Sequence, residues 1–151
     1  MPVERLRKHE LFELLNPKEM ERLSNASGVV RLKEGERVYS EGNPASHLFV
    51  LVTGRVELRR PARGGLSLLV DDIAEHGIFG VSSLMGGERY LLNAECVKDS
   101  ELVKIEGAVL RRILSDNPVV GFAVQSRVSQ IFFKRYVETM ARLEALTRAL
   151  P

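Results

Sequence analysis

Cysteine is almost absent from this sequence of 151 residues, which contains only Cys96 and no tryptophan. One cysteine excludes an intrachain disulfide framework and cannot hold an iron–sulfur cluster. No apolar run is long enough for a signal peptide or a membrane span. An excess of one charge is lacking too, because 22 lysines and arginines face 20 aspartates and glutamates, a net charge of +2. We therefore predict a cytoplasmic protein without a membrane partner, and the charge gives no support to a nucleic-acid surface.

Motifs for catalysis and for metal binding are also lacking. His9, His47 and His76 are far apart in the sequence and have no cysteine or carboxylate at metal-ligand spacing. None of them lies in a haem-ligand motif. There is no nucleophile elbow, Walker loop or dinucleotide fingerprint. We therefore predict that the chain is not an enzyme and has no metal site.

The pattern of apolar residues divides the chain into three parts, which we interpret as one domain over residues 1–151. Helical spacing over residues 3–24 predicts short N-terminal helices. Residues 27–106 carry many short apolar or alternating runs separated by turn residues, as is typical of an all-β sandwich or barrel. Residues 107–150 return to a helical pattern. The predicted strands are 29–32, 37–40, 48–52, 55–59, 66–73, 90–97 and 101–105.

A long helix is predicted at the end of the chain. Pro118 ends one helix and opens the next, and no further proline interrupts residues 119–150. A helix of roughly thirty residues is unusually long for one domain. A heptad seam in its second half favours a parallel two-stranded coiled coil, so we predict a homodimer, although the helix could instead fold back on its own domain. The predicted dimer-interface residues are Phe132, Tyr136, Thr139, Leu143, Leu146 and Leu150.

The segment "IFGVSSLMGGERYLLNA", residues 78–94, has the pattern of a cradle for an anion. Gly80 lets the backbone come close to a ligand, and Ser82 is a natural N-cap for a short helix. Free amides at a helix start attract phosphate. A stable β-roll alone explains the other glycines of the chain, so the glycines do not by themselves predict a ligand.

Three stretches give the β region a recognisable pattern: "LKEGERVYSEGNPASHLFVLVTGRVEL" at 32–58, "HGIFGVSSLMGGER" at 76–89 and "DSELVKI" at 99–105. Together they resemble the cyclic nucleotide-binding domain family, including the spacing of its turn glycines. The resemblance covers about residues 11–143. It implies a mainly β fold with flanking helices: a β jelly roll with N-terminal helices and a long C-terminal dimerisation helix that also acts as a lid.

The resemblance also identifies what a cyclic nucleotide would need. Binding members have a phosphate cassette that reads Phe-Gly-Glu-Leu-Ala-Leu, a variable loop, then Arg, Ser or Thr, and Ala. Gly80 is kept here, but Val81 stands at the glutamate, Tyr90 at the arginine and Leu91 at the hydroxyl residue. Charge-assisted hydrogen bonds contribute about 1.5–3 kcal/mol each and about 1.4 kcal/mol is tenfold in affinity, so we predict binding weakened by orders of magnitude. The candidate ligand-binding residues are Phe79, Gly80, Val81, Ser82, Ser83, Arg89, Tyr90, Leu91, Arg135 and Tyr136.

Two arginines are candidates to restore the lost cation. Arg89 precedes Tyr90, but adjacent side chains of a strand point to opposite faces, so Arg89 reaches the pocket only if the register shifts by one residue. The resemblance places Phe132, Arg135 and Tyr136 where the lid would meet a purine. Arg135 is a candidate to bind an anion or to form an ordinary surface salt bridge. The aromatic pair could stack on a base, although both residues fit the heptad seam better.

These features favour a regulatory, dimeric sensor domain for signal transduction, with lost or altered affinity for cyclic nucleotides. A true cyclic AMP or cyclic GMP receptor that uses Arg89 or Arg135 is one alternative. A ligand-free dimeric module that binds an unknown protein partner is another. A sensor would keep a polar-lined cavity beneath the lid, whereas a scaffold would fill it with Tyr90, Leu91 and Phe132. No cofactor is implied beyond a cyclic nucleotide or another small anion.

Many relatives are transcription factors with a helix-turn-helix domain after the dimer helix. A full-length chain that stops at Pro151 has no room for such a domain, which argues against direct DNA binding by this chain. If the chain is instead an excised fragment, the sensor part of a transcription regulator is the better interpretation. The start "MPVERLRKHELFELL" reads like a native N-terminus.

Overall fold

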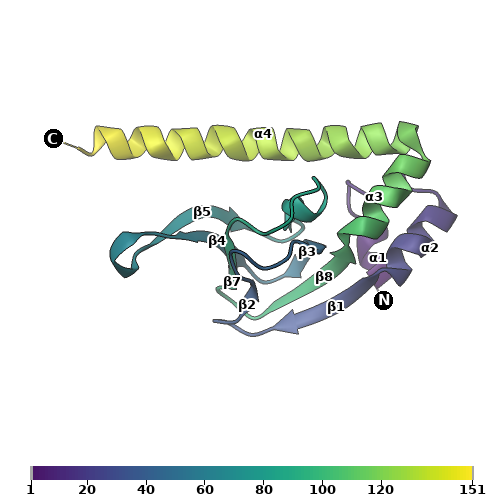
Figure 1. Cartoon of the computed structure of the whole chain (residues 1–151), viewed down its shortest axis with the longest axis horizontal. Helices are drawn as coiled ribbons and strands as arrows, with labels where there is room; N and C mark the ends of the chain where they lie inside the picture. Colours follow the sequence, from purple (N-terminus) through teal and green to yellow (C-terminus); the bar gives the residue numbers. More distant parts are fainter. Residues whose placement is uncertain (1, 151) are drawn as a thin grey trace.

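Short apolar strands pair into two antiparallel sheets that form a β-roll beneath one long helix (Figure 1). The computed structural model describes residues 2–150. The strand orders are β1-β8-β3-β6 and β2-β7-β4-β5. The strands are β1 (Ser27–Leu32), β2 (Arg37–Tyr39), β3 (His47–Thr53), β4 (Val56–Pro61), β5 (Ser67–Ile73), β6 (Ile78–Phe79), β7 (Asn93–Cys96) and β8 (Ser100–Glu106). The helices are α1 (Pro2–Arg7), α2 (Pro17–Asn25), α3 (Gly107–Asp116) and α4 (Pro118–Arg148), with short 3-10 turns η1 (Arg63–Gly65) and η2 (Val81–Ser83).

The predicted mainly β fold with flanking helices is confirmed, but two details of the strand prediction were wrong. Strand β6 was not predicted, because a two-residue strand is defined by its pairing with Phe49 and Val50 of β3 and has no periodicity of its own. The strand predicted over 90–97 begins only at Asn93. The residues before it are bent, since the Tyr90 amide and carbonyl bond to the loop at Gly42 and Asn43 and not to a neighbouring strand.

Strand β3 separates two apolar clusters because its side chains alternate between its faces. Leu48 and Val50 face the helical layer and pack with the helices, whereas Phe49 and Leu51 face the interior of the roll. All four are buried. Burial of each such side chain contributes about 1.5–3 kcal/mol to stability. Because β3 buries side chains in both clusters, it joins the helical layer to the roll.

Local capping fixes the helical layer. Asn16 and Glu19 form a capping box at the start of α2, where Pro17 occupies the first helical position. The second carboxylate oxygen of Glu19 accepts a hydrogen bond of 3.1 Å from the Asn117 side chain, which in turn caps α4. Gly121 permits the tight corner between α3 and α4, since a Cβ there would lie 2.3 Å from the Leu114 carbonyl oxygen.

Helix α4 spans 31 residues, so the predicted long helix is confirmed. Figure 1 shows it running across the roll from α3 towards the hairpin of β4 and β5. Val124 and Val128 are buried in the helical core, and Ile131 packs against it. Beyond Ile131, Arg135 and Arg142 reach from α4 to the roll. None of the helices within residues 2–150 combines the length and apolar character needed to cross a membrane.

His9 fastens the segment after α1 to the roll. Its Nδ1 accepts a hydrogen bond of 3.1 Å from the Leu11 amide, and its Nε2 lies 2.7 Å from the His76 carbonyl oxygen. Because an amide can only donate and a carbonyl can only accept, this geometry requires a neutral imidazole with its proton on Nε2. Burial of the ring lowers the pKa of His9 below its usual 6.5, and the bond to His76 and the charge of Glu10 only partly oppose this.

We expect this histidine to make stability depend on pH. Below about pH 6.5, His9 binds a proton in the unfolded chain but stays neutral in the folded one. The free energy of unfolding therefore falls as the pH decreases, by at most about 1.4 kcal/mol per pH unit for one group. Above that pH both states are neutral and the effect vanishes. Urea unfolding between pH 7.5 and 5.5 should show a smaller fall for His9→Gln than for the natural chain. Equal falls would contradict the assignment.

Candidate ligand pocket of the roll

The turn at Gly80 forms the cradle expected from the sequence. Gly80 has a φ of 76°, and a Cβ there would lie 2.9 Å from the His47 carbonyl oxygen, so glycine is needed. One expectation was wrong: Gly80, and not Ser82, occupies the N-cap of η2, because the left-handed glycine starts the turn earlier. The amides of Ser83 and Leu84 already donate to carbonyls within this turn. The cradle therefore offers an anion fewer free amides than a regular helix start does.

Aromatic rings fill the interior of the roll next to this cradle. The rings of Tyr39 and Tyr90 are stacked with centroids 3.7 Å apart, and those of Phe49 and Phe79 with centroids 5.3 Å apart. All four side chains are buried. A stacked pair contributes about 0.5–1.5 kcal/mol beyond its buried area. Stacking between these aromatic rings therefore stabilises this part of the roll.

Tyr90, which the sequence resemblance places at the phosphate-binding arginine, is hydrogen-bonded within the chain. Its hydroxyl accepts a hydrogen bond of 3.0 Å from the His47 amide and donates one of 2.7 Å to the His47 carbonyl. Burial raises the pKa of Tyr90, and burial also raises the pKa of Tyr39. The backbone of Gly80 interacts with the Tyr39 hydroxyl and opposes that rise. Both phenols are therefore neutral at physiological pH, and neither replaces a cation.

Arg135 extends from α4 towards the turn at Gly80. One guanidinium nitrogen donates a hydrogen bond of 2.6 Å to the Ile78 carbonyl, and Nε lies 3.3 Å from a carboxylate oxygen of Asp71. The guanidinium carbon stands 4.9 Å from the centre of the Phe132 ring. Burial lowers the pKa of Arg135, and the Asp71 carboxylate opposes this. The arginine is thus engaged by the chain, although its remaining nitrogen, Nη1, is buried without a hydrogen-bond partner among the described residues.

The other candidate residues lie apart from this group. Arg89 is exposed and donates to the Gly42 carbonyl at 2.7 Å. Leu91 and Tyr136 are 67% and 59% exposed, so neither fills the interior. Val81 packs against the helical core and not against the aromatic rings. The structure brings together Phe79, Gly80, Ser83, Tyr90 and Arg135.

Three residues that complete this site were missed in the sequence. Tyr39 and Phe49 were read only as strand residues, and alternation predicts burial of such side chains without saying which partner they meet. Asp71 lies in an apolar strand, where a carboxylate signals a charged partner, but its partner Arg135 is far away in sequence. Within the described residues, no cluster of His, Cys, Asp and Glu has the geometry to hold a metal ion.

The residues of the site do not fit a cyclic nucleotide. Val81 offers no carboxylate to a ribose hydroxyl, Tyr90 offers no charge to a phosphate, and stacked phenols occupy the space beside Gly80. Arg135 is the cation nearest to the cradle within this group, and it is already paired with Asp71. The site therefore keeps the backbone turn for an anion but not the side chains that would bind one.

The second half of α4 exposes a band of apolar side chains. The seam residues Phe132, Tyr136, Leu143, Leu146 and Leu150 are between 36% and 71% exposed, and Thr139 is half-buried. Three neighbours widen the seam, namely Phe133, Val137 and Met140, each at least 44% exposed. Arg135 and Arg142 reach from the same helix to the roll, and the band lies beside them, since Arg135 stands over the Phe132 ring and Arg142 donates to the Thr139 hydroxyl.

The fold and the cradle together define a ligand-sensing type of β-roll with a helical lid. A family model described as "Cyclic nucleotide-binding domain" matches residues 29–117. The chain therefore belongs to the cyclic nucleotide-binding domain family, and the resemblance found in the sequence is confirmed.

The chain is also similar to characterised regulators. It is 25% identical over 126 residues to the global nitrogen regulator of Synechococcus elongatus, and 23% identical over 110 residues to the CRP-like cAMP-activated global transcriptional regulator of Mycobacterium tuberculosis. These matches cover 80% and 73% of this chain but 56% and 49% of the relatives, so the chain spans about half their length. The sensor domain of the transcriptional regulator DNR from Pseudomonas aeruginosa has a TM-score of 0.78 and 27% identity, with 91% of this chain and 92% of that chain covered.

We predict that Arg135 holds the lid in place. Arg135→Met keeps the length of the side chain but leaves the Asp71 carboxylate and the Ile78 carbonyl without their partner. We expect the free energy of unfolding in urea to fall by about 2 kcal/mol, with faster amide exchange over residues 132–150. Arg148→Met is the matched control, because Arg148 is exposed and pairs with Glu144 one turn away. Its effect should stay below about 0.5 kcal/mol. Equal effects of the two variants would refute the role of Arg135.

Proposed function

We propose that this chain is a dimeric regulatory sensor domain in which contacts within the chain take the place of a bound cyclic nucleotide. The observation that carries the proposal is the Tyr90 hydroxyl, which makes two hydrogen bonds to the His47 backbone at the position where binding relatives have an arginine. Arg135 supports it from the lid, since its guanidinium is paired with Asp71.

The kinds of relative support a regulatory role. One curated relative is named a global nitrogen regulator and another a cAMP-activated global transcriptional regulator, and the similar structure from Pseudomonas aeruginosa is the sensor domain of a transcriptional regulator. This chain matches about half of each curated relative, so we assign it the sensing part of such a role. The proposal makes no use of a catalytic step.

Entry of a cyclic nucleotide would disturb several contacts at once. The ligand would have to separate the Tyr39 and Tyr90 rings, worth about 0.5–1.5 kcal/mol, and to break the two bonds to His47, worth about 1 kcal/mol each. Arg135, the cation of this group, is already paired with Asp71, and only its Nη1 lacks a partner among the described residues. The filled interior also favours the protein-interaction module over a true receptor, although Leu91 and Phe132 take no part in the aromatic stack.

We expect the natural chain to bind cyclic AMP with a Kd no tighter than about 1 mM. Isothermal titration calorimetry measures this directly, and micromolar binding would overturn the proposal. Tyr39→Ala with Tyr90→Arg opens the interior and supplies the missing charge, so this variant should bind at least about tenfold tighter than Tyr39→Ala with Tyr90→Phe. The control pair opens a similar space without a charge. Circular dichroism should confirm that both are folded.

Dimerisation through α4 is the second part of the proposal. An exposed apolar band along the last five turns of a long helix is costly in water and is covered when two such helices form a coiled coil. The helix does lie across its own domain, held by Arg135 and Arg142, but Leu143 and Leu146 stay 58% and 65% exposed, so the domain does not cover the band. A second copy offers an identical band and a two-fold symmetric way to cover both.

We predict that Leu143→Asp converts the dimer to a monomer, because it places a charge from each chain in the seam, where water is excluded. Leu91→Asp is the matched control: Leu91 is similarly exposed but lies in a loop of the roll. Multi-angle light scattering should give the mass of one chain for Leu143→Asp and of two chains for Leu91→Asp and the natural sequence. A dimer that survives Leu143→Asp would disprove the seam, whatever the ligand-binding result.

A further inference from the structure

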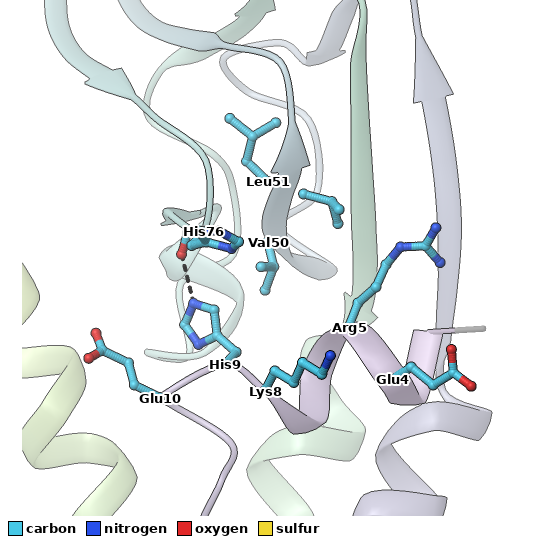
Figure 2. A pocket seen from close by; sticks show the side chains of 9 residues that line it. Glu4, Arg5, Lys8, His9, Glu10, Val50, Leu51 and His76 are labelled. Carbon is cyan, nitrogen blue, oxygen red and sulfur yellow. Dashed lines mark hydrogen bonds between the residues drawn. The ribbon is translucent and has the colours of Figure 1, made fainter.

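A second cavity lies outside the roll, between α1, the loop that follows it and β3 (Figure 2). Its volume is about 580 Å³, within the range of about 300–1,000 Å³ that is usual for small-molecule sites. The residues that matter for its chemistry are Arg5, Lys8, His9, Val50, Val52 and His76.

The cavity exists because the helical layer covers β3 incompletely. Helix α1 has only six residues, and β6 pairs with Phe49 and Val50 of β3 before it ends. The register between β3 and β8 shifts between Leu51 and Thr53. Val52 is consequently only half-buried, although it packs against the same apolar cluster as Val50. These two valines form an apolar floor.

This floor belongs to the opposite face of the sheet from the Gly80 cradle. Val50 and Val52 belong to the helical cluster, whereas Phe49 and Leu51 belong to the cluster inside the roll. A ligand in this cavity would therefore not compete for the space that Tyr39 and Tyr90 fill. The wall beside it is rigid, since both ring nitrogens of His9 are bonded within the chain, one of them to His76.

Two cationic side chains, Arg5 and Lys8, line the cavity. Arg5 pairs with the Glu101 carboxylate at 2.5 Å, and Arg31 approaches the same carboxylate at 3.6 Å. Among the described residues, Lys8 has no ion pair, and Figure 2 shows its side chain extending below Val50. Glu4 and Glu10 also line the cavity, and Figure 2 shows their carboxylates at its two sides, away from Val50. His9 adds no charge, because its geometry requires the neutral ring.

We propose that this cavity binds a small organic anion, a carboxylate or a phosphate monoester on a short apolar body. Lys8 contacts the anionic group, with the field of Arg5 behind it, and Val50 and Val52 contact the apolar body. Such a ligand would bridge α1 to β3. The ligand needs a charged end for Lys8 and an apolar end for Val50 and Val52.

Octanoate and octyl phosphate are suitable probes, and 1-octanol and inorganic phosphate each lack one of the two features. Titration of the ¹⁵N-labelled full chain should give saturable shifts of amides in residues 4–10, 50–52 and 76–77. We expect at least one octyl anion to bind at about 1 mM or tighter, and 1-octanol and inorganic phosphate to bind at least about tenfold more weakly. Comparison of the two octyl anions tells a carboxylate site from a phosphate site.

Variants then locate the contacts. Lys8→Met should weaken the octyl anion about tenfold, and Lys134→Met, an exposed lysine on α4, should not. Val52→Trp should abolish binding by filling the cavity. The proposal fails if neither octyl anion gives saturable shifts, if the shifts lie along the apolar band of α4, if 1-octanol binds equally well, or if both Lys8→Met and Val52→Trp bind as the natural chain does.

Discussion

The position of α4 over the roll depends on the guanidinium of Arg135, which is largely shielded from water. Apolar packing of α4 against the helical core ends near Ile131, and the helix continues for more than four turns past it. Arg135 bridges this gap by bonding Ile78 and Asp71 at once, and Arg142 adds a bond to the Val70 carbonyl. A buried cation without partners is strongly unfavourable, so moving the lid would require water to reach this arginine again. The contact therefore couples the helix to the turn that carries Gly80.

The Gly80 cradle is a feature of the backbone. Its turn is defined by the backbone: Gly80 is held between the His47 carbonyl and the Phe49 ring, with no space for a side chain. In the proposed sensor, the side chains that would bind a nucleotide are replaced while this turn is kept. Tyr90 ties its loop to β3 by the two bonds that its hydroxyl makes to His47, which removes the need for a ligand to hold these segments together. Stability and ligand binding are thereby separated.

Features set by residues close together in the sequence could be predicted, whereas features set by residues far apart could not. The long helix, the roll and the turn at Gly80 were predictable, because periodicity, proline and glycine act over a few residues. The resemblance also predicts that Tyr90 stands where a phosphate-binding arginine would, and this stays a prediction. Strand β6 was not, since pairing with β3 defines it, and the Arg135 partner Asp71 was not, since the two lie 64 positions apart. The outer cavity was hidden for the same reason: it reflects helices that stop short of Val52, and no local pattern records an uncovered surface.

Strand β3 borders both the interior of the roll and the outer cavity, one on each of its faces. The inner face is filled by aromatic rings, while the outer face is left partly open beside Lys8. Both faces meet at the approach to Gly80, where the His76 carbonyl accepts from His9 and the Ile78 carbonyl accepts from Arg135. These two acceptors are two residues apart on one short segment. The N-terminal segment and α4 are consequently held by neighbouring points of the same backbone.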